Sequence, residues 1–88
     1  MTGIEITPER LQDVEEFEGI LRGAGISTLR VRICRDGKDG LFLRVEVPPQ
    51  EMENVLRCRE ELLRVGTERG YRWVTLDLGG YRMGGGVS

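Results

Sequence analysis

The first quarter of the chain has the period of an amphipathic helix. Thr7 can cap such a helix, Pro8 fits its first turn, and Gly23 and Gly25 favour its end. Acidic side chains, including Asp13, occupy positions outside the apolar stripe. The spacing of three, three, three and one residues keeps the stripe on one helical face. Its members are Leu11, Val14, Phe17, Ile20 and Leu21.

Two later segments alternate between apolar and polar residues, as half-buried β-strands do. The first runs from Thr28 to Cys34 and the second from Leu41 to Val47. The loop Arg35–Gly40 between them contains Asp-Gly pairs, so we predict a β-hairpin. One face of the hairpin is then apolar, with Leu29, Val31, Ile33, Leu43, Val45 and Val47, and the other carries Arg30, Arg32, Cys34, Phe42, Arg44 and Glu46.

A second helix and a third strand follow. Pro48-Pro49 stops the second strand and can open a helix, and Gly70 suits its end. The segment Trp73–Leu78 is predicted to be a strand that Gly79-Gly80 terminates, with Trp73 in the core or at an interface. The helix buries an apolar stripe formed by Met52, Val55, Leu56, Leu62 and Leu63.

The predicted order is therefore helix, strand, strand, helix, strand. A right-handed crossover would place the third strand parallel to the second. We expect an α+β fold, a single two-layer domain spanning residues 1–83, with two helices on one face of a mixed three-stranded sheet. The opposite sheet face is then polar or contacts a partner, and the Gly-rich tail 84–88 is expected to be disordered.

Composition and charge argue against several classes of function. The chain has 88 residues, enough for one domain, and its net charge of −2 argues against a general nucleic-acid binder. No apolar run approaches membrane length, and no signal peptide is recognised, so we expect a cytoplasmic protein. Histidine is absent, which excludes a Ser/His/Asp triad and, with two distant cysteines, a Cys/His zinc site within the chain.

The arginines of the predicted hairpin are the main candidate site. Arg30, Arg32 and Arg44 share one face with Glu46 beside them. Guanidinium groups can converge on a phosphate or another anion. The same pattern is also typical of a solvated sheet face with cross-strand Arg–Glu pairs, and the residues alone leave both interpretations open.

Two weaker candidates accompany this face. Cys34 follows the arginines, which would raise its reactivity if it is exposed, although lone cysteines more often pack. The same two alternatives apply to Cys58. The acidic group Glu15, Glu16 and Glu18 offers carboxylates for a metal, but an outward helical face is the commoner use of such a cluster.

The C-terminal part carries a recognisable motif. The segment Val74-Thr75-Leu76-Asp77-Leu78-Gly79-Gly80-Tyr81-Arg82 resembles the C-terminal domain of the ATP-dependent sacrificial sulfur transferases, the LarE family of PP-loop ATP pyrophosphatases. The similarity runs from about Ile4 to Met83. Other matching stretches, in the same order, are Ile6–Leu11, Arg30–Arg32 and Arg44–Pro48.

The resemblance implies a function in sulfur transfer. Enzymes of that family adenylylate and then thiolate a pyridinium precursor of a nickel-pincer cofactor. Neither their Ser-Gly-Gly-x-Asp-Ser loop nor their Pro-Cys-x-x-Ser-Arg sulfur-donor segment occurs in these 88 residues. We therefore expect a non-catalytic accessory or oligomerisation module that self-associates or docks onto a PP-loop protein. A free-standing anion, nucleotide or metal-binding regulatory domain is the alternative, and a sulfur-handling enzyme using Cys34 is a third.

The resemblance also assigns roles to individual residues. Arg30 and Arg32 correspond to anion contacts, and Glu46 and Glu18 to carboxylates near a metal. No covalently bound cofactor is expected, and phosphate, nucleotide or a divalent metal would occupy a shared site. The chain departs from the family in its longer hairpin loop and in lacking a histidine after the Arg-x-Arg strand.

Overall fold

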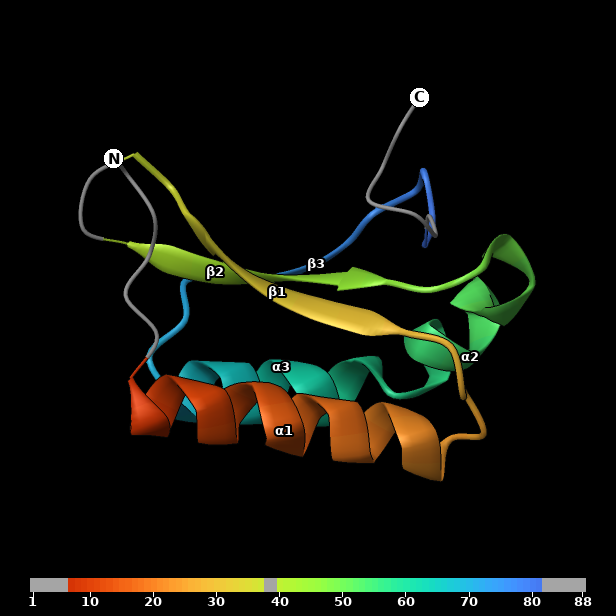
Figure 1. The fold of residues 1–88 in the computed structure, drawn as a ribbon, viewed down its shortest axis with the longest axis horizontal. Helices are drawn as coiled ribbons and strands as arrows, with labels where there is room; N and C mark the ends of the chain where they lie inside the picture. The colour runs from red at the N-terminus through yellow and green to blue at the C-terminus, as the bar shows by residue number, and fades with distance from the viewer. Residues whose placement is uncertain (1–6, 38–39, 82–88) are drawn as a thin grey trace.

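A computed structural model describes residues 7–37 and 40–81, which form two layers (Figure 1). The three-stranded sheet lies over α1 and α3, so the predicted α+β architecture and element order are confirmed. The predicted tail 84–88 lies outside the described residues. The elements are α1 (Pro8–Gly23), β1 (Arg30–Arg35), β2 (Leu41–Glu46), the 3₁₀ helix η1 (Pro49–Glu51), α2 (Met52–Arg57), α3 (Arg59–Glu68) and β3 (Val74–Leu76).

The sheet has the strand order β1-β2-β3. β1 and β2 pair antiparallel, with Arg30 opposite Glu46 and Arg32 opposite Arg44. β3 pairs parallel with β2 and places Thr75 beside Arg44. The mixed sheet predicted from the strand–helix–strand order is therefore correct.

Helix α1 begins as the sequence indicates, because the Thr7 side chain accepts a hydrogen bond from the Arg10 backbone N–H at 3.2 Å. Its buried face differs from the prediction at two residues, since Leu11 of the predicted stripe is half exposed and Asp13 is buried. Asp13 is buried together with Phe17 and Leu21, one and two helical turns away. The expectation that Asp13 belongs to the acidic outer face was wrong, and its polar partners, described below, explain the burial.

The predicted second helix is divided. α2 ends at Arg57 and α3 begins at Arg59, because the Cys58 N–H bonds to the Val55 carbonyl, three residues back, at 2.9 Å. A bond of this type tightens the turn and breaks the α-helical pattern. Of the predicted apolar stripe, Val55 and Leu62 are buried, whereas Leu56 and Leu63 are exposed, as follows from their positions on a different helical face.

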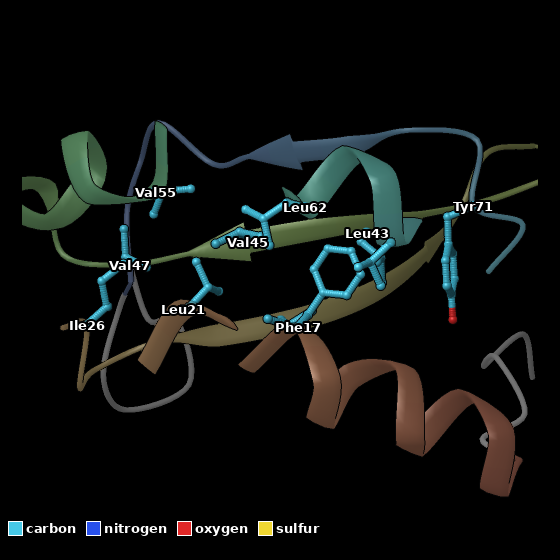
Figure 2. Close-up of a cluster of buried hydrophobic side chains, with 11 residues drawn as sticks. Phe17, Leu21, Ile26, Leu43, Val45, Val47, Val55, Leu62 and Tyr71 are labelled. Atoms are coloured by element: carbon cyan, nitrogen blue, oxygen red, sulfur yellow. The ribbon is translucent and has the colours of Figure 1, made fainter. Parts of the chain in front are cut away.

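The core fills the space between the inner sheet face and the helices (Figure 2). α3 approaches the sheet closely at Gly66, where an added Cβ would lie 2.7 Å from Val74 Cγ2. The most completely buried side chains are Phe17, Leu21, Ile26, Leu43, Val45 and Val47.

β3 is shorter than the predicted Trp73–Leu78, because the chain turns directly after it. The Asp77 carboxylate accepts a hydrogen bond from the Gly79 N–H at 2.8 Å, and Gly80 N–H bonds to the Asp77 carbonyl at 3.0 Å. Gly80 has φ +84, and an added Cβ would lie 3.2 Å from the Val47 carbonyl oxygen, so glycine is required there. Within the described ranges, no helix is long and apolar enough to span a membrane.

Candidate functional site

The sheet face opposite the helices, here called the outer face, carries three cross-strand rows. Each row takes one side chain from each strand or its immediate continuation, as the register and strand alternation require. The first row is apolar and aromatic, and the other two are charged. The rows are Cys34–Phe42–Trp73, Arg32–Arg44–Thr75 and Arg30–Glu46–Asp77.

The charged rows form one ionic network, which we call the arginine cluster. It consists of Arg30, Arg32, Arg44, Glu46 and Asp77. Arg44 Nε donates to Glu46 Oε2 at 3.1 Å and lies 3.8 Å from Asp77 Oδ2. The Nη1 atoms of Arg30 and Arg32 each lie 3.9 Å from a Glu46 carboxylate oxygen. The structure thus brings together the three predicted arginines and Glu46.

Glu46 is the centre of this cluster. Its side chain is only 8 % exposed, whereas that of Arg32 is 50 % exposed. Arg32 and Arg44 stand directly opposite each other, an arrangement that is unfavourable for like charges unless a carboxylate lies between them. Burial of Glu46 without cations would be costly, so the arginines and Glu46 stabilise each other.

The cluster keeps hydrogen-bonding capacity for a ligand. A separation of 3.9 Å is beyond hydrogen-bonding distance, so Arg30 and Arg32 are held by charge rather than by directed bonds to Glu46. The three guanidinium groups outnumber the two carboxylates, which leaves a positive excess. An oxyanion could accept N–H donors from the half-exposed arginines. Anion binding itself stays a prediction.

The metal prediction rests on carboxylates from two layers. Glu46 lies on the outer sheet face, while Glu18 belongs to α1, which covers the opposite face (Figure 1). Within residues 7–37 and 40–81, no three or more Asp, Glu, Cys and His side chains are grouped in a way that could hold a metal ion. A metal role for Glu46 and Glu18 stays a prediction.

The aromatic row extends the outer face at its other end. The rings of Phe42 and Trp73 lie 6.2 Å apart, and Trp73 is 47 % exposed. The Arg72 guanidinium stacks over the Trp73 ring at 5.3 Å and pairs with Asp36 at 3.1 Å. Cys34 is partly buried at the start of this row. The outer face is therefore mixed, cationic at one end and aromatic at the other.

A second polar cluster, which sequence reasoning missed, fastens α1 to the segment after α3. The Tyr71 hydroxyl donates to Asp13 Oδ2 at 2.7 Å, and Arg69 Nη1 donates to Asp13 Oδ1 at 2.7 Å. Arg69 also pairs with Glu16, and Arg10 Nη1 donates to the Tyr71 hydroxyl at 3.3 Å. Figure 2 shows the Tyr71 hydroxyl pointing away from the sheet toward α1.

The contacts of this second cluster raise the pKa values of two of its residues. Burial, followed by the hydrogen bond to Asp13, raises the pKa of Tyr71 above its usual value. The hydrogen bond to Asp13 raises the pKa of Arg69. A signal for the cluster existed in the sequence, since Asp13 shares the four-residue spacing of Phe17 and Leu21 and therefore lies on the buried face.

Comparison with known proteins finds similarity to part of larger chains. No protein-family model matches this chain. The chain is 34 % identical over 82 residues to pyridinium-3,5-bisthiocarboxylic acid mononucleotide synthase of Lactiplantibacillus plantarum, and 36 % identical over 84 residues to an uncharacterised protein of Synechocystis. Each match covers 93 % of this chain but only 28 % and 30 % of the relatives. The chain is thus related to one region, less than a third of the length, of a synthase of this type.

Proposed function

We propose that this domain is a non-catalytic accessory module that self-associates or docks onto a sulfur transferase of the PP-loop ATP pyrophosphatase type. The observation that carries the proposal is the match to the Lactiplantibacillus synthase, which covers 93 % of this chain and 28 % of that protein. In the relative, the matching region shares a polypeptide with the rest of the synthase. A domain of this kind is expected to act beside the remainder of such an enzyme.

The outer sheet face supports docking by its composition. Arginine and aromatic side chains are the residues most enriched at protein interfaces and at their energetic hot spots. The outer face presents both, with Trp73 and Arg32 each about half exposed. The helices α1 and α3 occupy the other face, where they complete the core. The outer face is therefore the part of the sheet left for a partner.

The arginine cluster would have a specific role in the complex. A PP-loop enzyme handles ATP, whose phosphates and adenylylated products are anions. Arg30 and Arg32 extend from the outer face, which we take as the docking face, with N–H donors that Glu46 does not bind directly. Docked beside the partner's nucleotide, they would supply positive charge and hydrogen bonds to an oxyanion, and the bond-making groups would belong to the partner.

Affinity capture of partner proteins from a lysate of the native host tests this proposal. The immobilised chain is compared with Arg32→Glu, which inverts a half-exposed charge of the docking face, and with Arg57→Glu, an exposed arginine of α2. Wild type and Arg57→Glu should retain a protein that mass spectrometry identifies by a Ser-Gly-Gly-x-Asp-Ser loop, and Arg32→Glu should not. Equal recovery by both variants, or no such protein, would refute docking through this face.

A free-standing anion-binding domain is the second candidate. It is favoured by the two 3.9 Å separations, which leave Arg30 and Arg32 without directed bonds to Glu46. Titration calorimetry with phosphate, AMP, ATP and Ni²⁺ tests it. Arg30→Ala should weaken anion binding by about 1–3 kcal/mol, the contribution of a charged hydrogen bond. Absence of heat with all four ligands would eliminate this candidate.

A further inference from the structure

A groove with a volume of ≈ 450 Å³ follows the edge of the sheet at β1. Residues of α1 and β1 line it, and α1 lies beneath β1 (Figure 1), so the groove opens at the side of β1 that faces away from β2. Its apolar part is formed by Leu11, Val14 and Ile33. Leu11 is 50 % exposed and the other two are partly buried, although the sequence pattern assigns all three to buried faces. Side chains of core type are therefore open to an occupant here.

The backbone of β1 has one side available for pairing. The Leu43 N–H donates to the Trp73 carbonyl at 3.0 Å, so the next residue of β2, Arg44, directs its peptide groups at β1. Arg32 stands opposite Arg44, and its own peptide groups therefore point back to β2. The residues on either side of Arg32 then direct their N–H and C=O groups to the open side. Among the described strands, none pairs with that side of β1.

An added strand at this edge would have two different faces. An open strand edge is a template for an extended segment, which gains main-chain hydrogen bonds and places alternate side chains in pockets. In an antiparallel addition, the residues opposite Val31 and Ile33 would exchange backbone hydrogen bonds with them and direct their side chains inward, into the groove. The intervening residues would direct their side chains to the outer face, beside Arg30 and Arg32. The edge therefore fits an alternating sequence.

The charge at this edge selects acidic side chains for the outward positions. Of the described residues, those that line the groove include three arginines, Arg10, Arg30 and Arg32, and no carboxylate. The side chains of Arg30 and Arg32 are 43 % and 50 % exposed, and both lie 3.9 Å from Glu46, beyond hydrogen-bonding distance. A carboxylate on the added strand could accept their free N–H groups in charge-assisted hydrogen bonds.

We propose that the β1 edge binds an extended segment of a partner protein as an added antiparallel strand, with apolar side chains directed into the groove and acidic side chains beside Arg30 and Arg32. A second copy of β1 would bring arginines, rather than carboxylates, to the outward positions. The inference names the kind of segment that a docking partner would present, and it rests on the proposed function only for the identity of the protein that carries this segment.

Titration of the isotope-labelled full chain with a synthetic peptide, followed by NMR, tests this strand addition. The peptide is Ser-Val-Glu-Val-Glu-Val-Ser, blocked at both ends, which can place its central valine opposite Val31 and its glutamates opposite Arg30 and Arg32. The backbone amide signals of Val31 and Ile33 should shift most, because their N–H groups gain peptide partners. The same peptide with lysine in place of glutamate should bind at least about tenfold more weakly, because it places like charges together.

Methylated peptides separate strand pairing from charge attraction. Methylation of the central valine nitrogen removes a donor that points at β1, so the dissociation constant should rise at least about fivefold. Methylation of a glutamate nitrogen, which points to solvent in the antiparallel arrangement, should change it by less than about twofold. All peptides keep the same two negative charges, so these two differ only in the donor that is lost.

A pair of protein variants locates the groove. Leu11→Glu places a carboxylate beneath the inward valines and should weaken binding at least about fivefold. Leu56→Glu, on α2 and away from β1, is the matched control, because Leu56 has a similar exposure of 55 %, and it should change binding by less than about twofold. Both positions are exposed, so both variants should fold, and circular dichroism checks this directly.

Each result decides the proposal. Saturable binding of the glutamate peptide, with the expected losses for the lysine peptide, the valine-methylated peptide and Leu11→Glu, supports it. Absence of saturable shifts up to about 1 mM peptide, equal losses for the two methylated peptides, or equal losses for the two protein variants overturns it. The assay contains no PP-loop protein, so failure of peptide binding would leave capture of such a protein untouched, and failure of capture would leave the strand addition standing.

Discussion

Replacing Tyr71 by phenylalanine isolates the bond that ties α1 to the segment after α3. The Tyr71 ring is almost fully buried and belongs to the core, so phenylalanine keeps its packing. The change removes the hydroxyl that donates to Asp13 Oδ2 at 2.7 Å. It also removes the acceptor for Arg10 Nη1, whose 3.3 Å bond is longer and weaker.

The expected loss follows from the charge and burial of Asp13. A hydrogen bond to a charged group contributes about 1.5–3 kcal/mol, and Asp13 is only 6 % exposed. Arg69 still donates to the other carboxylate oxygen, which limits the penalty for leaving the charge underpaired. We predict that Tyr71→Phe lowers the free energy of unfolding by about 2 kcal/mol at pH 7. For a domain of this size, with a urea slope of about 1 kcal/mol/M, the midpoint falls by about 2 M.

Urea unfolding followed by far-UV circular dichroism measures this loss. The variants are Tyr71→Phe, Asp13→Ala and their combination, which form a double-mutant cycle. The coupling energy between the two residues should be at least about 1 kcal/mol. A loss below about 0.5 kcal/mol for Tyr71→Phe, with additive effects in the double variant, would refute the argument that this buried bond fastens α1.

The stability difference between wild type and Tyr71→Phe should also depend on pH. Folding raises the pKa of Tyr71, so the native state holds this proton more tightly than the unfolded chain, whose tyrosine has a pKa of about 10. The stabilisation by the hydroxyl is complete below about pH 10 and is lost as the pH rises through the higher native pKa. The stability difference between wild type and Tyr71→Phe should be constant from pH 7 to about 9 and shrink above about 10. A difference that grows at high pH would contradict the sign of the shift.

Two further substitutions test the packing of α3 and the arginine cluster. Gly66→Ala should destabilise the fold by about 1–3 kcal/mol, because the added Cβ would lie 2.7 Å from Val74. Gly19→Ala in α1, where an added Cβ has nothing within 4 Å, should stabilise the fold by up to ~1 kcal/mol. Equal effects of the two substitutions in thermal unfolding would contradict the close approach of α3 to the sheet. Glu46→Gln should cost about 1–3 kcal/mol in urea unfolding, since three arginines lose their buried counter-charge, and the exposed Glu53→Gln should cost less than about 0.5 kcal/mol. A neutral Glu46→Gln would mean that the cluster does not depend on this carboxylate.

The strand faces were predictable because alternation is a local property. Once Leu43 and Val45 point inward, Arg44 and Glu46 must point outward, and hairpin pairing then aligns them with Arg30. Asp77 joins the cluster through the parallel pairing of β3, whose register depends on the length and position of the whole crossover. Sequence reasoning therefore found the arginines and missed the second carboxylate.

The remaining differences arise from contacts between distant segments. The spacing of Asp13 from Phe17 and Leu21 indicates its burial, but its partners Arg69 and Tyr71 lie 56 and 58 residues further along the chain, and no local pattern specifies them. The break at Cys58 has a similar character, since Pro or Gly does not mark it in the sequence. Leu56 and Leu63 are exposed for a different reason, because each follows a buried residue, Val55 or Leu62, by one position, a rotation of about 100° around the helix.

The affinity between the purified chain and the proposed PP-loop partner tests the central claim most directly. Calorimetric titrations of wild type, Arg32→Glu and Arg57→Glu at low and physiological salt would be compared. We predict that Arg32→Glu weakens binding at least about tenfold, that Arg57→Glu does not, and that salt weakens wild-type binding. Equal affinities for all three proteins would contradict a docking face at the arginine cluster.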